Sequence, residues 1–144
     1  MATGSRTDPY GGYNFLVEID GLSQANFAEC SGLSSSVDVI EYREGGDRII
    51  RKLPGLHKVG DITLKRGVTN SSELQDWHRR IVNGQPDRRD GIITLLDDAL
   101  SPVVRWRFSN AFPRKWEGPN LKAEGNDVAI ETLVLCCEDL ERES

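Results

Sequence analysis

The chain has 144 residues, of which 38% are hydrophobic and 28% charged, so it is expected to form one globular domain and not a disordered chain. Its formal net charge of −5 argues against a general nucleic-acid-binding protein. No stretch approaches the roughly 20 apolar residues of a membrane span, and residues 1–12 lack the apolar segment of a secretion signal, so we expect neither a membrane anchor nor a signal peptide.

Two-residue periodicity predicts the first strands. In residues 13–20 every second side chain is apolar, which is typical of a half-buried strand: Tyr13, Phe15, Val17 and Ile19. An Asp-Gly pair predicts the turn that follows. Residues 26–35 predict a weaker strand of small residues. In residues 36–42 the apolar alternation changes phase halfway, which predicts a β-bulge or a strand that buries different faces along its length.

Residues 41–60, EYREGGDRIIRKLPGLHKVG, predict an extended loop between two strands. The segment carries five Lys or Arg side chains, a Gly-Gly pair and a Pro-Gly pair. Among them stand four large aliphatic residues: Ile49, Ile50, Leu53 and Leu56. A solvated loop has no need of such aliphatics, so the segment either folds back over its own barrel or is buried against a partner.

The charges are distributed unevenly along the chain. Residues 1–40 carry one Arg against five acids, a net charge of −4. Residues 41–123 carry sixteen Lys or Arg against eleven acids, a net of +5, and residues 124–144 carry one Arg against seven acids, a net of −6. Oppositely charged regions can dock copies of a chain head to tail. On this feature alone an ordinary mixed surface is the simpler interpretation.

Further strands follow in the second half of the chain. Residues 61–67 place Ile62 and Leu64 inward, and residues 91–98 are apolar on both faces, which predicts a strand covered on both sides. Residues 103–109 alternate apolar with Arg, and residues 113–119 predict a short strand or turn bounded by prolines. Residues 127–140 are the longest strand candidate, central in a sheet or at an interface.

One segment, at about residues 71–83, has helical periodicity. Its apolar stripe is Leu74, Trp77, Ile81 and Val82. Either Asn70 with Glu73 or Ser72 with Gln75 can cap its start, and Asn83-Gly84 ends it. Because nothing repeats at the strand–helix period of a parallel sheet, the predicted fold is mainly β: an antiparallel β-barrel or sandwich with one flanking α-helix.

The sequence offers no convincing catalytic, cofactor or metal site. The two histidines, His57 and His78, are expected to be a solvated loop residue and a packing or surface residue. The chain has three cysteines, an odd number of which two are adjacent: Cys30, Cys136 and Cys137. We therefore expect reduced thiols and synthesis in a cytosol. Adjacent cysteines in a strand point to opposite faces and do not readily bind one metal. No phosphate-binding glycine motif is present.

Several segments in a fixed order resemble the tail tube proteins of T4-like contractile tails, and above all the inner tube proteins of extracellular contractile injection systems. They are NFLVEIDG, FAECSGL, EYREGG…LPG…K…DITLKRG, LQDW, LLDD and RWRFSNAFPRKWEGPNLKAEGNDVAIE. The resemblance runs from about Pro9 to Leu140, and it is the combination in order that makes it specific. Cys136-Cys137-Glu138-Asp139 depart from it, since Ala-His-Glu-Gly is frequent there in the family.

The resemblance implies a structural protein. Six copies would form a ring whose strands join into one continuous inner β-barrel, and rings would stack into a tube inside a contractile sheath. Sheath contraction would drive the tube through a target envelope, and the lumen can hold protein cargo. The implied partners are other copies of this chain, a sheath protein, and baseplate, tube-initiating and cap proteins. Assembly in the cytoplasm, as part of a phage tail or an injection particle, is expected.

The resemblance also assigns expected roles to residues of a single domain, 1–144, with a flexible segment at 1–9 and an inter-subunit loop at 41–60. Contacts between subunits or rings are expected from Arg48, Ile49, Ile50, Arg51, Lys52, Leu53, Leu56 and Lys58. A helix face directed to the sheath is expected from Glu73, Asp76, Arg79 and Arg80. Lumen candidates are Asp38, Glu41, Thr63 and Lys65.

Two other functions are compatible with this chain. A tube-initiating or tube-capping adaptor would have the same fold, but the compact domain without insertions favours the main tube. A monomeric ligand-binding β-barrel would need a pocket with convergent polar groups, for which the sequence has no candidate set. For the tube and for both alternatives, we expect neither an enzymatic activity nor a cofactor.

Overall fold

A computed structural model describes residues 8–22 and 26–143. The elements in chain order are β1 (Phe15–Ile19), β2 (Glu29–Ser31), β3 (Ser35–Tyr42), β4 (Arg51–Val59), β5 (Ile62–Gly67), α1 (Glu73–Val82), β6 (Arg89–Leu96), β7 (Pro102–Glu117), β8 (Ile130–Cys136) and β9 (Asp139–Arg142). Most of the predicted flexible segment, residues 1–7, lies outside the described residues. No described helix combines the length and the apolar character needed to cross a bilayer.

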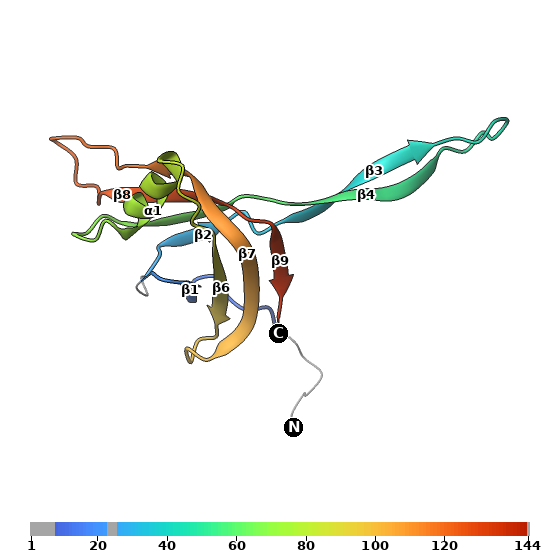
Figure 1. The fold of residues 1–144 in the computed structure, drawn as a ribbon. Coiled ribbons are helices and arrows are strands. Elements are labelled where there is room, and N and C mark those ends of the chain that lie inside the picture. The colour runs from blue at the N-terminus through green and yellow to red at the C-terminus, as the bar shows by residue number, and fades with distance from the viewer. Residues whose placement is uncertain (1–7, 23–25, 144) are drawn as a thin grey trace, which may run out of the picture.

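Seven strands form one antiparallel sheet in the order β1-β6-β7-β8-β5-β2, with β9 paired to β7 outside this path. The 16-residue strand β7 joins the two halves of the sheet: its first part pairs with β6 and β9, and its second part pairs with β8. Asn110, at φ 52°, and a register shift between Pro113 and Lys115 lie near the point where the partners change. A strand that bends from one half-sheet into another is how orthogonally packed sheets form corners, and the strand curves through the body in Figure 1. The mainly β, antiparallel architecture with one helix is therefore confirmed.

Two strand predictions are corrected by this topology. Residues 113–119 do not form a separate short strand, because β7 continues through Pro113 and ends at Glu117. The predicted long strand at 127–140 is divided into β8 and β9, and β7 is longer than either. Alternation cannot reveal such changes of partner, because it indicates which face of a strand is buried and not which strand is paired along its edge.

The core lies between the two half-sheets and the helix. Ile62, Leu64, Leu133 and Leu135 of the neighbouring strands β5 and β8 have no exposed surface. Other buried members of the core include Val17, Ile19, Leu74, Trp77, Ile93 and Phe108. On β6 a side chain at Gly91 would overlap the ring of Phe108, so glycine is required for the close approach of β6 to β7.

Helix α1 covers the core with Leu74 and Trp77, both buried as the periodicity predicts. The indole Nε1 of Trp77 donates a hydrogen bond of 2.8 Å to the carbonyl of Asp87, so its one polar atom is satisfied. Asn83 caps the C-terminus and Gly84 follows at φ 79°, as expected. Neither predicted capping box forms: Ser72 is the N-cap residue, and its Oγ donates to Asp76 Oδ2 at 2.8 Å.

An ion pair lies inside this core. Arg66 Nε of β5 donates to Glu131 Oε1 of β8 at 2.7 Å, and both side chains are less than a tenth exposed. The Trp116 indole also donates to Glu131 at 3.4 Å, and Arg66 lies 5.9 Å from the ring centroid of Phe27. Because removing one member of a buried pair leaves an uncompensated charge, the pair fixes the register of β5 against β8.

Trp77→Ala is expected to lower the free energy of unfolding by about 3–5 kcal/mol, since it removes a buried indole and leaves a cavity. Denaturant unfolding of the subunit measures this change. Val82→Ala is the matched control on the same helix, because Val82 is largely exposed; it should change stability by less than about 0.5 kcal/mol. Equal losses in the two variants would contradict this packing.

Candidate assembly interface

Residues 41–60 do not form the predicted loop. Residues 51–59 are strand β4, which pairs with β3 in a two-stranded antiparallel hairpin; we call residues 35–59 the arm. The arm projects from the body (Figure 1). The sequence predicts a loop across β4 because a Pro-Gly pair, here at 54–55, is rare inside strands. The structure accommodates the pair because β4 is an edge strand with a bulge at this point.

The bulge explains the change of phase in residues 36–42. The pairing shifts from Val37 opposite His57 to Val39 opposite Pro54, so β4 has one extra residue there. The predicted β-bulge is therefore confirmed. A Cβ at Gly55 would lie 3.1 Å from the carbonyl oxygen of Asp38, so the small residue suits the tight crossing at the bulge.

Large apolar side chains are exposed along the whole arm. Their exposed fractions range from 42% to 73%: Val37, Val39, Ile40, Tyr42, Ile49, Ile50, Leu53 and Leu56. Because directly opposed residues share a face, Ile40 and Leu53 lie on one face of the hairpin, whereas Val39 and Pro54 lie on the other. Both faces of the arm are thus partly apolar, although neither packs against the body of the same subunit.

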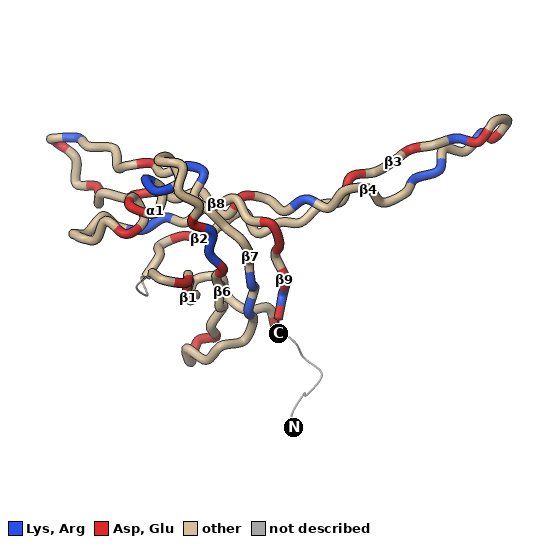
Figure 2. Tube along the Cα trace, in the orientation of Figure 1, with Lys and Arg blue, Asp and Glu red and all other residues tan. Residues whose placement is uncertain are grey.

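The arm also carries charges that its own residues neutralise only in part (Figure 2). Lys58 lies 3.3 Å from Asp38 and Arg51 lies 3.9 Å from Asp47, and all four side chains are well exposed. No described residue forms an ion pair with Arg48 or Lys52. Exposed pairs of this kind contribute little to stability, so the charges add no rigidity to the hairpin.

A two-stranded hairpin without a covering layer is only marginally stable in water. The arm has such a structure, and it presents the side chains that a covered strand would bury. The physical properties of the arm are therefore those of a segment that is covered by another molecule.

Comparisons with known proteins agree with this arrangement. The family model of the T4-like virus tail tube protein gp19 matches residues 11–141. The chain belongs to this family. No curated protein matches the sequence.

Solved structures of injection systems are similar over nearly the whole chain. A chain of the PVC sheath–tube complex in its extended state is 33% identical with a TM-score of 0.86, covering 94% of this chain and 92% of that one. A chain of the anti-feeding prophage baseplate, solved with six-fold symmetry, is 30% identical with a TM-score of 0.85, covering 96% and 97%. A chain of the anti-feeding prophage tube-terminating cap is 30% identical with a TM-score of 0.88, covering 97% and 94%.

The residues expected to contact a neighbouring copy all lie in the arm. Arg48, Ile49 and Ile50 are in its turn, whereas Arg51, Lys52, Leu53, Leu56 and Lys58 are on β4. Sequence reasoning did not include the apolar residues of β3 among these contacts, because it predicted there only a β-bulge or a strand that buries different faces along its length. Alternation alone cannot distinguish a strand that packs in its own core from one that packs against another copy.

The helix residues expected to face the sheath are not all equally exposed. Asp76 and Arg79 are exposed on α1, and Arg80 lies 3.0 Å from Asp87. Glu73 is half-buried and lines a small cavity beside Arg66. Beside the helix C-terminus an open groove of about 410 Å³ includes Ile81 and Phe112 in its walls.

The lumen candidates fall in two separate places. Asp38 and Glu41 are on the arm, whereas Thr63 and Lys65 are on β5 in the body. Lys65 pairs with Glu29 of β2 at 3.3 Å. The structure therefore does not bring these four residues together on one surface.

The thiols are poor candidates for chemistry. Burial, with a smaller contribution from Glu29, raises the pKa of Cys30 to about 11. Burial, with smaller contributions from Cys136, Asp61 and Asp139, raises the pKa of Cys137 to about 11. No described residues form a group of three or more His, Cys, Asp or Glu that could hold a metal ion.

Alkylation of Cys30 and Cys137 by iodoacetamide at pH 8 should be roughly a hundredfold slower in the folded protein than in urea, because the thiolate is the nucleophile. Mass spectrometry of peptides measures the two rates. The folded state binds these protons more tightly, so its stability should fall as the pH rises from 9 through 11. Equal alkylation rates in both states would contradict the raised pKa values.

Proposed function

We propose that this protein is the repeating subunit of the inner tube of a contractile injection machine, with six copies in each ring and rings stacked into a tube. The observation that carries this proposal is the arm, which exposes apolar side chains on both faces and has no covering layer of its own. The six-fold symmetry of the similar baseplate structure supports the size of the ring. The sheath–tube complex among the similar structures supports a sheath as partner.

In this function the protein acts mechanically and is not an enzyme. The sheath contracts around the tube and drives it through a target envelope, and the lumen holds cargo. Subunits are made and assembled in the cytoplasm, with a baseplate where the tube begins and a cap where it ends. The particle is of the extracellular, phage-tail-like kind to which the similar PVC and anti-feeding prophage structures belong.

An adaptor at one end of the tube is the second candidate, because similar chains occur in a baseplate and in a tube-terminating cap. The two functions differ in copy number. A tube subunit should be present in many rings along each native particle, whereas an adaptor should contribute one or a few rings at an end. Labelling of a tagged subunit in intact particles, viewed by electron microscopy, distinguishes them.

Replacement of Ile49 and Ile50 together by Asp should leave a folded protein that forms no tubes. Two charges in place of exposed aliphatics leave the core unchanged but cannot be buried in a contact between rings. Circular dichroism checks the fold, and negative-stain electron microscopy at high concentration checks assembly. The matched control, Ile49→Val with Ile50→Val, should assemble like the unmodified protein. Normal tubes from the Asp variant would falsify the role of the arm.

Arg79→Glu should reduce association of the sheath with preformed tubes at least tenfold while the tubes themselves still form. Arg79 is exposed on the outer face of α1 and pairs with no described residue, so its reversal alters the surface potential without breaking an internal contact. Co-sedimentation of sheath with tubes measures the effect, and Arg79→Lys is the control. Undiminished sheath binding by Arg79→Glu would show that this face is not the sheath contact.

A further inference from the structure

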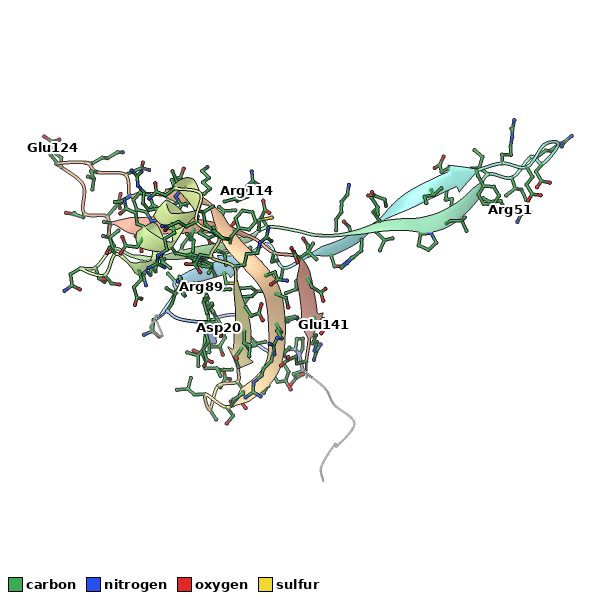
Figure 3. The ribbon with its side chains drawn as sticks, in the orientation of Figure 1. Asp20, Arg51, Arg89, Arg114, Glu124 and Glu141 are labelled. Carbon is green, nitrogen blue, oxygen red and sulfur yellow. The ribbon has the colours of Figure 1, made fainter. Side chains whose placement is uncertain are left out.

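The protein has two projecting segments, and they lie at opposite ends of the molecule. Strands β4 and β5 follow one another along nearly one line, from the arm through the body (Figure 1). The loop of residues 118–129, between β7 and β8, projects at the other end. In Figure 3, Arg51 marks the arm and Glu124 marks this loop. The loop has twelve residues without a helix or strand, a length that is usually functional.

The end opposite the arm also exposes apolar side chains. Leu121 is 83% exposed, Val128 is 75% exposed and Val68 is 44% exposed. The amide of Val68 donates to the carbonyl of Ala129 at 2.9 Å, which ties the end of β5 to the loop. We call Val68, Leu121, Val128 and the loop around them the loop end.

A hollow of about 400 Å³ lies beside this loop, and its walls are Lys65, Glu117, Gly118, Asn120, Asp127, Val128, Ile130 and Thr132. A hollow of this volume can admit one or two aliphatic side chains of a partner. Val128 and Ile130 offer apolar contacts to such side chains. The carboxylates of Glu117 and Asp127 can accept hydrogen bonds from a cationic segment, since Lys65 in the same wall is already paired with Glu29.

The charges of the loop end complement those of the arm. No described residue forms an ion pair with Glu124 or Asp127 at one end of the molecule, or with Arg48 or Lys52 at the other. The loop end also carries Lys122, and the arm also carries Arg43, Glu44 and Glu41, the last directly opposite Lys52, so the charges outside the described ion pairs sum to −1 at the loop end and +1 on the arm. Charges of this kind orient an encounter between copies and set its register.

Two other surfaces match the arm less well. On the open face of β1, β6, β7 and β9, Glu18, Ile92, Arg107 and Glu141 lie opposite one another in one row. This acidic row suits the cationic side chains of the arm, but it has little exposed apolar surface against which the aliphatic side chains of the arm can pack. In the groove beside α1, Arg80 and Arg88 are already paired with Asp87 and Glu138.

We propose that the arm tip of one copy docks on the loop end of a copy in the next ring, with Ile49 and Ile50 against Leu121 and Val128. This inference rests on the proposed function of the arm and adds the surface that receives it. Because the two surfaces lie at opposite ends of one subunit, their contact is head to tail. A head-to-tail contact that does not close generates a filament, which is what stacked rings require.

Cysteine cross-linking tests the contact. Ile49→Cys and Val128→Cys subunits, carrying tags of different size, are mixed, assembled and oxidised. A disulfide-linked heterodimer is expected, at least tenfold more abundant than from Ile49→Cys mixed with Glu18→Cys, which tests the acidic sheet face. Oxidised unmodified tubes give the baseline set by the native cysteines. A heterodimer with Glu18→Cys in place of Val128→Cys would overturn the proposal.

Unmodified tubes give a second measurement that depends on no variant. A carbodiimide joins amines to carboxylates without a spacer, so Lys52 should become linked to Glu124 or Asp127 of another copy, and mass spectrometry identifies the linked peptides. If tubes form but show neither link, the loop end is not the surface that receives the arm, and the proposed role of the arm itself still stands. Tubes that assemble normally from the Ile49→Asp, Ile50→Asp variant overturn both proposals, since the arm is then not the contact.

Discussion

The arm requires a covering layer, and the other features of this subunit follow from that constraint. It exposes eight large apolar side chains, each roughly half accessible. Burial of the exposed half of such side chains contributes about 1 kcal/mol each, or about 8 kcal/mol for the arm. The loss of translational and rotational freedom on association costs about 4–15 kcal/mol. The free energy gained by burying one arm is therefore close to the cost of association. A stable assembly needs several contacts for each subunit.

The body of the subunit gives the arm a fixed base. Strand β4 leads directly into β5, whose Ile62 and Leu64 are fully buried. At the base of the arm Asp61 pairs with Arg114 of β7, and the amide of Gly60 donates to the carbonyl of Ser34 at 3.1 Å. The arm is thus continuous with β5, whose Arg66 pairs with Glu131 of β8 inside the core.

Local periodicity predicted the elements whose partners lie within the subunit. The stripe with Leu74 and Trp77 predicted the helix, and the alternation around Ile62 and Leu64 predicted a core strand, because burial in the same chain determines both patterns. The same logic does not place Val37 and Val39, which alternate as in a core strand but are largely exposed in the subunit. Likewise, the Pro-Gly pair at 54–55 suggested a loop, since a bulged edge strand that tolerates it has no local signature. The loop at 118–129 was overlooked because Leu121 stands alone in a polar segment without periodicity.

The uneven charges of the chain contribute less to assembly than their sum implies. Of the seven acids in residues 124–144, Glu131, Glu138 and Glu143 lie in ion pairs with Arg66, Arg88 and Arg107 of the same subunit. These three carboxylates are therefore paired within the subunit and add little to any attraction between copies. What remains for contacts between copies is a small number of exposed charges, which salt screens strongly. In the proposed contact, the aliphatic side chains of the arm supply most of the free energy, and the exposed charges orient the copies as they meet.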